Sequence, residues 1–379
     1  MIPIDFQGKQ PIVRNTAFIY DESYFWHDAG ASVLALPPNP SKYLQPDGSA
    51  ESPESKRRFK NLLEASGLYA DLTIIKPEPV TEEVLQYFHT KRHIDNVKEL
   101  SASGGGDCGA LAIVGNGSYE IANLAVGGAV DAVRAVLDEK VDNAYALTRP
   151  PGHHAEKDRG MGFCIFNNVA IAAHYARKEY GLQRVAIIDW DVHHGNGTED
   201  AFYDDPNVLF ASLHQEGFFP ANRGKINDIG IGKGVGATVN IPLHAGTGNA
   251  GYIYALEHIV VPVIDNFKPE LIIISAGQDA NIFDPLSRTM VTVEGYTMMT
   301  KIMMELADKH CKGRLVAVHE GGYSTAYVPF CSHAIIEELK GLKTSVGDPF
   351  AGLFEGTSYN TLASWQKERI EEIRKVHIK

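Results

Sequence analysis

Cysteine is scarce in this chain, which has only four in 379 residues. Cys108, Cys164, Cys311 and Cys331 lie far apart, and no two of them form a Cys-x-x-Cys pair. Closely spaced cysteines mark most cysteine zinc sites, and small disulfide scaffolds carry many more of them. The sequence therefore indicates neither kind of structure.

Long apolar runs and a signal peptide are also missing. A membrane-spanning helix needs ~20 consecutive apolar residues, and no stretch approaches that length. Residues Met1 to Asp5 lack the basic segment and apolar core of a secretory signal. We therefore expect a cytoplasmic protein that has no membrane partner.

Basic residues are outnumbered, with 35 Lys and Arg against 47 Asp and Glu and a formal charge of −12. Nucleic acids and anionic lipids attract basic proteins, so we expect neither as the main partner. Apolar residues make up 44% of the chain, as in ordinary globular proteins. Because no linker, internal repeat or low-complexity tract interrupts residues 1–379, we expect a single domain.

Strand-like and helix-like segments alternate along most of the chain. Apolar, β-rich runs predict strands at 143–147, 184–188, 208–213, 271–275 and 315–318. Helical periodicity covers 119–137, 165–180, 252–267 and 293–309. This alternation predicts an α/β fold with a mostly parallel sheet.

Unusual polar residues follow the predicted strands. They lie in the segments 149–154, 189–197, 214–215, 277–281 and 319–324. Ligands of open α/β sheets bind beyond the carboxyl ends of the strands. The convergence predicts one site and an enzyme.

Two aspartates and a histidine follow the strand at 184–188. Alternation would place Asp189, Asp191 and His193 on one side of an extended chain. Asp279, after a later strand, would complete a set of one nitrogen and two oxygen ligands. Such a set suits catalytic Zn²⁺ with an open coordination position. By itself the motif could also be a polar turn.

His153 and His154 follow Pro150, Pro151 and Gly152, which restrict the loop. Histidine can take a proton from water and return one to a leaving amine near neutral pH. Asp189 and Asn196 are candidates for orienting the two imidazoles. A pair of histidine metal ligands is the alternative.

Aromatic residues supply further candidates. Tyr323, after two glycines, could donate a hydrogen bond to a developing oxyanion, or it could pack in the core. Phe163 and Phe219 could form apolar walls of the site, or they could also belong to the core.

Residues 36–56 are rich in Pro, Ser and Gly and precede a helical pattern, so we predict a long surface loop. The loop could line the rim of the site, mediate homo-oligomerisation or simply be solvated. We expect a homo-oligomer.

These motifs together resemble the zinc-dependent histone deacetylase family, and most closely its class II and bacterial amidohydrolase-like members. The matching segments are Arg149–His154, Gly162–Asn168, Asp189–Gly197, Ser212–His214 and Glu320–Tyr323. Asn196 supports this, since class I members usually have Asp there, and the segments Phe25–Gly30 and Lys56–Arg58 resemble the bacterial group. The resemblance implies the arginase/deacetylase fold, with about eight mostly parallel strands flanked by helices and the active site at their carboxyl ends.

The resemblance also implies roles for individual residues. Asp191, His193 and Asp279 would bind Zn²⁺. His154, oriented by Asn196, would be the general base and acid, and His153, paired with Asp189, would act electrostatically. Tyr323 and the metal would polarise the acyl carbonyl. The residues implied to contact the substrate are Gly162, Phe163, Phe219 and Leu286.

Monovalent cations, K⁺ or Na⁺, are implied at two further places. One set of matching residues is Asp189, Asp191, His193, Ser212 and Leu213, and the other is Phe202, Asp205 and Val208. Arg58 matches the arginine of an internal cavity through which acetate leaves.

Three positions bear on the activity. A polyamine-selective human class IIb enzyme has a glutamate at the position of Leu286; leucine favours an acetylated lysine peptide or protein, or another acetylated amine. Gln278 replaces a frequent Phe, which could alter local packing. Tyr323 is retained, so we expect a competent deacetylase.

Other activities stay open at this stage. An acetylpolyamine amidohydrolase would use the same chemistry. An arginase-like dimanganese ureohydrolase would need an Asp-x-Asp pair where the chain reads Asp279-Ala280-Asn281. A non-catalytic acyl-binding protein is a third possibility.

Overall fold

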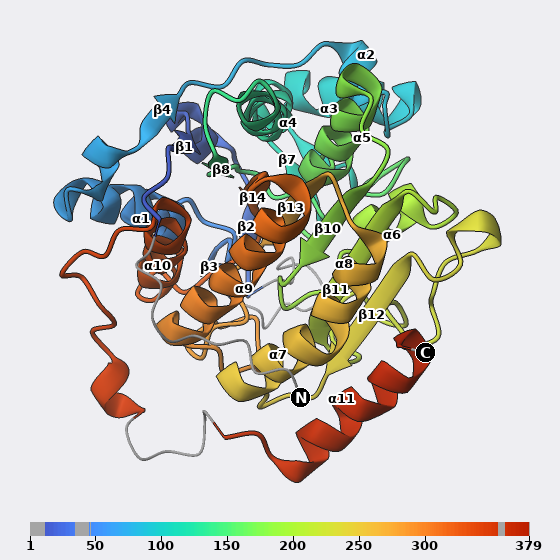
Figure 1. Cartoon of the computed structure of the whole chain (residues 1–379). Helices are drawn as coiled ribbons and strands as arrows, with labels where there is room; N and C mark the ends of the chain where they lie inside the picture. Colours follow the sequence, from blue (N-terminus) through green and yellow to red (C-terminus); the bar gives the residue numbers. More distant parts are fainter. Residues whose placement is uncertain (1–11, 35–44, 46, 355–360, 379) are drawn as a thin grey trace.

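A central sheet of eight strands, all of them parallel, organises the molecule (Figure 1). The computed structural model describes residues 12–34, 45, 47–354 and 361–378. The strand order is β12-β11-β10-β13-β14-β8-β1-β4. In chain order the strands are β1 (Thr16–Ile19), β4 (Thr73–Ile75), β8 (Asn143–Ala146), β10 (Val185–Asp189), β11 (Val208–Gln215), β12 (Thr238–Leu243), β13 (Leu271–Ala276) and β14 (Leu315–His319).

The predicted α/β fold is confirmed, and each of the five predicted strands is present. Sequence reasoning missed β1, β4 and β12, which add the two edges of the sheet. β1 and β4 contain only four and three residues, too few for a clear periodic pattern. Three two-stranded pairs lie outside the main sheet: β2 (Ala31–Ser32) with β3 (Asp47–Gly48), β5 (Gly106–Asp107) with β7 (Ile113–Val114), and β6 (Gly109–Ala110) with β9 (Gly160–Met161).

Helices cover both faces of the sheet, because side chains of each strand alternate between two apolar cores. Ile188 belongs to one core and its neighbour Ile187 to the other. The first face carries α1 (Glu54–Ala65), α7 (Asn249–Ala255), α8 (Val261–Phe267), α9 (Val293–Cys311) and α10 (Val328–Lys340), and α11 (Ser364–His377) lies beside β12. The second face carries α2 (Glu82–Leu85), α3 (Lys91–Ala102), α4 (Ser118–Leu137) and α5 (Asn168–Tyr180).

Three of the four predicted helices match α4, α5 and α9, with small differences at their ends. α5 begins at Asn168, three residues later than predicted, because the Asn167 side chain accepts the Ala170 N–H (2.9 Å) and caps the helix. The helix predicted over 252–267 is divided into α7, a π-helical turn over Leu256–Val260 and α8. None of the helices among the described residues is long and apolar enough to cross a membrane.

The surface loop predicted for 36–56 is wrong at its carboxyl end. Residues 36–44 and 46 lie outside the described residues, and α1 already begins at Glu54. Glu51 and Lys56 are fully buried, and the Glu51 carboxylate contacts both the Lys56 ammonium (3.1 Å) and the Arg149 guanidinium (3.0 Å). A buried arginine requires a buried counter-charge, which polar composition alone does not reveal.

Arg58 is exposed on α1, so it cannot line an internal cavity as the resemblance implied. The buried cations nearby are Lys56 and Arg149, whose Nη1 donates to the carbonyl oxygens of Tyr24 and His27. Helical periodicity explains the difference, because residues two apart on a helix face different directions.

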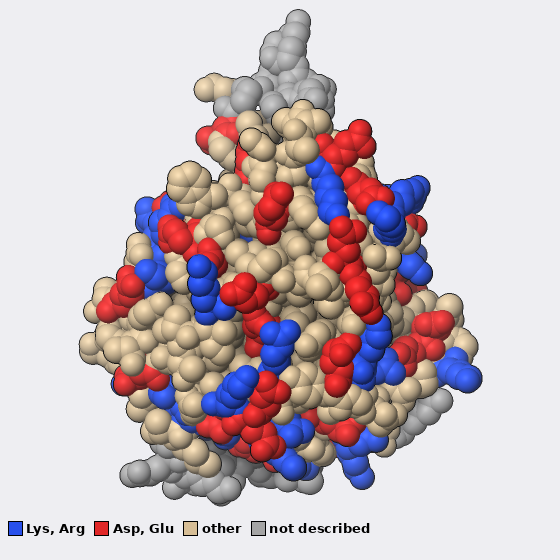
Figure 2. All heavy atoms as spheres, turned by 90° about the horizontal axis from the view of Figure 1, so that it is seen from above, with Lys and Arg blue, Asp and Glu red and all other residues tan. Residues whose placement is uncertain are grey.

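Charged side chains of both signs are interspersed over the face shown in Figure 2. Among the described residues, charged side chains form local ion pairs, such as Lys91 with Asp95 (2.6 Å) and Lys60 with Glu64 (2.8 Å). This face therefore presents no continuous basic surface of the kind that binds nucleic acid.

His89 makes the stability of the fold dependent on pH. Its Nε2 accepts the Asn167 N–H (2.8 Å), and burial, together with nearby His93, lowers its pKa from 6.5 to about 3. Between these values the unfolded chain binds the proton more readily, so stability is lost as the pH falls below 6.5. We expect His89 to contribute up to about 1.4 kcal/mol per pH unit to this loss.

Urea denaturation of the wild type and His89→Gln across this pH range measures the effect. The variant should show a shallower fall in the free energy of unfolding. His244→Gln is the control, because that side chain is 39% exposed. Equal slopes for the wild type and His89→Gln would contradict the assignment.

Candidate active site

The predicted site residues meet at the carboxyl ends of β10, β13, β14 and β8, which are consecutive strands in the middle of the sheet. Asp191 and His193 follow β10, and Asp279 follows β13. Tyr323 follows β14, and the tandem histidines follow β8. Parallel pairing of these four strands is what brings the loops together.

Asp191, His193 and Asp279 form a buried cluster, with ligand atoms within 4.8 Å of one another. His193 Nδ1 lies 3.0 Å from both Asp191 Oδ1 and Asp279 Oδ2. Tetrahedral zinc with bonds of about 2.0 Å has ligands about 3.3 Å apart. The one nitrogen and two oxygen donors therefore fit such an ion.

The sequence predicted that alternation along an extended chain would bring the ligands together. The structure brings them together in a different way. β10 ends at Asp189, and the backbone bends over residues 191–193. Asp189 Oδ1 accepts the Asp191 N–H (3.1 Å), and Asp191 Oδ1 accepts the His193 N–H (2.9 Å). These consecutive Asx turns aim the side chains.

The cluster attracts positive charge. Burial alone lowers the pKa of His193, but its hydrogen bonds to Asp191 and Asp279 raise that pKa to about 10. Burial and the Asp191 carboxylate raise the pKa of Asp279 to about 8. Two carboxylates this close are ionised together only with a cation between them, which a metal ion supplies.

Glycines let the neighbouring loops approach the cluster. A Cβ at Gly321 would lie 2.2 Å from Asp279 Oδ2, and one at Gly277 would lie 2.3 Å from Asp191 Oδ2. The Gly321 N–H donates to Asp191 Oδ2 (2.8 Å). Larger residues would push the carboxylates apart.

The tandem histidines have different partners. His153 Nδ1 lies 2.9 Å from Asp189 Oδ2, and His154 Nδ1 lies 2.9 Å from Asn196 Oδ1, at the start of α6 (Asn196–Phe202). Their ring centroids are 4.0 Å apart, and the His154 ring lies 5.9 Å from the His193 ring.

These partners drive the two pKa values apart. Burial lowers the pKa of His153, but Asp191 and Asp189 outweigh burial and raise it to about 10. Burial and the neighbouring His153 hold the pKa of His154 well below its usual range. One imidazole is therefore charged and the other neutral, which divides an electrostatic role from that of a base.

Glu320 holds the loop of the tandem histidines, a role that sequence reasoning missed. Its buried carboxylate accepts the N–H groups of Gly152 (2.6 Å) and His153 (3.1 Å). The available signal was an acidic residue directly after a strand, beside two glycines.

Aromatic rings surround the cluster. The Phe219 ring lies 5.0 Å from that of His154, and the Phe163 ring lies 5.8 Å from that of Tyr323. A Cβ at Gly162 would lie 2.8 Å from Phe219 Cε1. Phe218, which sequence reasoning did not select, stacks on His193 at 5.6 Å and is 39% exposed.

Comparison with known proteins identifies the family of this chain. The family model described as the histone deacetylase domain matches residues 49–339. A histone deacetylase-like amidohydrolase of Pseudomonas aeruginosa is 45% identical over 366 residues, which cover 96% of each chain. The chain belongs to the histone deacetylase family.

Two more relatives agree with this membership. A probable deacetylase of Archaeoglobus fulgidus is 38% identical over 354 residues, covering 89% of this chain and 96% of the relative. The crystal structure of the HDA15 HD domain superposes with a TM-score of 0.83 at 32% identity, covering 96% of this chain and 94% of the other. The predicted family membership and the predicted arginase/deacetylase fold are therefore confirmed. Membership of this family supports a deacetylase or amidohydrolase activity.

Two of the predicted cation residues in this histone deacetylase family member are neighbours in the sheet. Asp189 of β10 pairs in register with Ser212 of β11, directly before Leu213. Phe202 ends α6, and its carbonyl accepts the Asp205 N–H (3.0 Å) shortly before β11 begins at Val208. His194 is not part of the Asp191-His193-Asp279 cluster; its ring lies 4.7 Å from that of His214.

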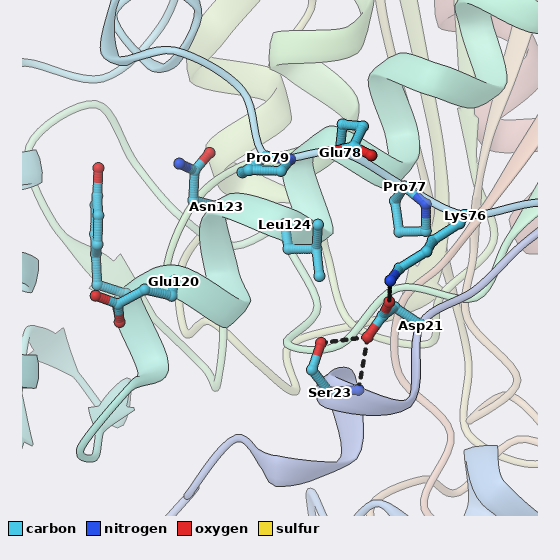
Figure 3. A pocket seen from close by; sticks show the side chains of 10 residues that line it. Asp21, Ser23, Lys76, Pro77, Glu78, Pro79, Glu120, Asn123 and Leu124 are labelled. Carbon is cyan, nitrogen blue, oxygen red and sulfur yellow. Dashed lines mark hydrogen bonds and ion pairs between the residues drawn. The ribbon is translucent and has the colours of Figure 1, made fainter.

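A separate cavity of ≈ 560 Å³ lies away from these residues (Figure 3). It is bordered by the 3₁₀ helix at Glu22–Trp26, by residues 76–79 and by the first turns of α4. Lys76 reaches Asp21 across it at 3.9 Å. Its lining includes no predicted site residue.

Proposed function

We propose that this protein is a zinc-dependent hydrolase that removes acetyl groups from lysine side chains of peptides or proteins, or from similar amines. The observation that carries the proposal is a pair of histidines beside a buried Asp-His-Asp cluster, one bonded to a carboxylate at Asp189 and the other to a neutral amide at Asn196. A neutral base next to a metal-type site is the arrangement that hydrolytic activation of water requires.

Asp191, His193 and Asp279 would hold the Zn²⁺ ion. When bound, zinc supplies Lewis-acid activation of water and of the acyl carbonyl. The carboxylates are fixed for this by backbone N–H groups, such as that of Val192, which donates to Asp279 Oδ1 (2.8 Å).

His154 would move the proton. Asn196 Oδ1 accepts the Nδ1–H, which leaves Nε2 free to take a proton from the attacking water. Water adds to the carbonyl carbon, the C–N bond breaks, and His154 returns the proton to the departing amine. The products are acetic acid and the free amine, which at neutral pH become acetate and the ammonium ion when the acid passes its proton to the amine. His153, charged beside Asp189, stabilises the negative charge that develops.

Tyr323 would donate a hydrogen bond to the developing oxyanion. Burial and the Asp279 carboxylate raise the pKa of Tyr323 well above its usual value, so the hydroxyl keeps its proton. Such donors act at full strength in a site shielded from water.

The substrate methylenes would pass between Phe163 and Phe219, with Gly162 leaving room for them and Leu286 at the rim. Leucine provides no charge to attract a polyamine ammonium group, so we favour acyl-lysine over acetylpolyamine. Four further expectations stay predictions. They are structural K⁺ or Na⁺ at the two sets of predicted cation residues, a homo-oligomer, a single domain over residues 1–379 and a cytoplasmic location.

A dimanganese ureohydrolase is disfavoured by the role of Asn281. Its Nδ2 donates to the Gln278 carbonyl (2.6 Å), and its Oδ1 accepts the Phe283 N–H (2.9 Å). The amide shapes the turn after Asp279 and offers no second carboxylate for a bridging metal.

Metal content tests the ligand assignment. Wild-type protein loaded with zinc and desalted should retain about one Zn²⁺ per chain by elemental analysis. Asp279→Asn should retain far less, because a neutral amide is a weaker zinc ligand. Asp142→Asn, which loses a carboxylate bonded to the Asn15 N–H (2.7 Å) before β8, is the control. Two manganese ions per chain would overturn the mononuclear assignment.

Tyr323→Phe tests the oxyanion donor. We expect kcat on an acetyl-lysine peptide to fall roughly 10²–10³-fold at unchanged zinc content. Tyr296→Phe is a matched control, because its fully buried hydroxyl has no hydrogen-bond partner among the described residues. A Tyr323→Phe variant as fast as the wild type would remove this role.

A substrate panel tests the amine preference. The wild type should hydrolyse an acetyl-lysine peptide more efficiently than N-acetylputrescine. Leu286→Glu should shift the ratio of kcat/KM toward the polyamine by roughly tenfold, because the carboxylate attracts its ammonium group. Wild-type protein active only on the polyamine would favour an acetylpolyamine amidohydrolase, and binding without turnover would favour an acyl-binding protein.

A further inference from the structure

A buried carboxylate helps to join the loops after β13 and β14, which are also linked by the Gln278 N–H bond to the Gly321 carbonyl (2.9 Å). Asp284 lies on the first loop, five residues after Asp279, and the residue is 7% exposed. Its Oδ2 accepts the N–H groups of Tyr323 (2.8 Å) and Ser324 (3.2 Å) on the second loop.

The same carboxylate also organises its own loop. Asp284 Oδ1 accepts the Leu286 N–H (3.0 Å), and the Asn281 side-chain amide approaches Oδ2 at 3.4 Å. One side chain thus binds backbone N–H groups at Tyr323 and at Leu286, the proposed oxyanion donor and the proposed substrate-rim residue.

Tyr323 needs such an anchor because two glycines precede it. Gly321 is confined against Asp279 Oδ2, and Gly322 adopts a φ of +135°, a conformation open almost only to glycine. The Ser55 hydroxyl donates to the Gly322 carbonyl (2.8 Å), which holds the turn before the tyrosine. The backbone N–H groups of Tyr323 and Ser324 are held by Asp284.

We propose that Asp284 is a positioning residue that sets the place of the Tyr323 hydroxyl and aligns it with the substrate rim at Leu286. This inference rests on the proposed function, since it assigns Asp284 to the placement of the oxyanion donor. Asp284 would act through the backbone N–H groups that it binds on the two loops.

The chemistry of the bonds defines the test. Asp284 uses both oxygens as acceptors for N–H groups on opposite sides. Asparagine has one acceptor oxygen, and its NH₂ group would face an N–H on the other side. Asp284→Asn keeps the shape of the side chain. Its oxygen should stay on the Leu286 N–H, because asparagine forms the same Asx turn, so the bond to the Tyr323 N–H is the one that breaks.

Kinetics of Asp284→Asn, Tyr323→Phe and the double variant on an acetyl-lysine peptide provide the measurement. We expect Asp284→Asn to lower kcat roughly 10- to 100-fold at unchanged zinc content. In the Tyr323→Phe background it should cost less than about threefold, because residues that act as a unit have non-additive effects.

Glu337→Gln is the matched control. Glu337 has the same 7% exposure, and its carboxylate accepts the Thr344 N–H (2.7 Å) in the loop after α10. It should leave kcat within about twofold of the wild type, since surface and distant changes rarely alter catalysis.

A crystal structure of Asp284→Asn adds a readout that does not depend on activity. Tyr323 should leave its place beside Phe163, where the ring centroids are now 5.8 Å apart. If Asp284→Asn unfolds, the smaller Asp284→Ser replaces it in both measurements.

Three results would overturn the inference: an undisplaced Tyr323, an unchanged kcat, or losses that multiply in the double variant. A wild type inactive on every acylated amine would instead refute the proposed function, and the position of Tyr323 would still decide the role of Asp284.

Discussion

Buried carboxylates that accept backbone N–H groups hold this site together. Asp191 binds the Gly321 N–H, Glu320 binds those of Gly152 and His153, and Asp284 binds that of Tyr323. Each bond links loops that leave different strands of the sheet. Charge-assisted bonds of this kind are stronger than neutral ones and hold side chains in a fixed geometry. The loops therefore behave as one unit although they are far apart in sequence.

The same carboxylates determine the electrostatics of the centre. The Asp191 and Asp189 carboxylates raise the pKa of His153 to about 10, whereas burial and the neighbouring His153 hold the pKa of His154, which is bonded to the neutral amide of Asn196, well below its usual range. Placing negative charge beside one imidazole and not the other separates two chemically identical residues. The proposed division between an electrostatic and a proton-transferring histidine follows from this asymmetry.

Sequence patterns predicted the parallel sheet, five strands that are consecutive in it (β11, β10, β13, β14 and β8) and the segments that form the site. They succeeded because buried strands such as Leu271–Ala276 are continuous apolar runs followed by polar loops. They failed at 36–56, where Glu51 and Lys56 are buried by pairing with each other and, for Glu51, with Arg149. The family resemblance also assigned Arg58 to an internal cavity, but Arg58 is exposed. Pairing of distant charges leaves no local pattern.

The sequence by itself determined the residue types that the chemistry needs, including Asp191, His193, Asp279, His154 and Tyr323, and the strand ends at which they lie. Only the tertiary structure decided how they are aimed. The contact of Asp279 with the Val192 N–H, the loop contact of Glu320 and the bonds of Asp284 depend on groups from other strands. Local propensity acts over a few residues, whereas these orientations come from contacts between segments up to about 170 residues apart, such as Glu320 with Gly152 (168 positions).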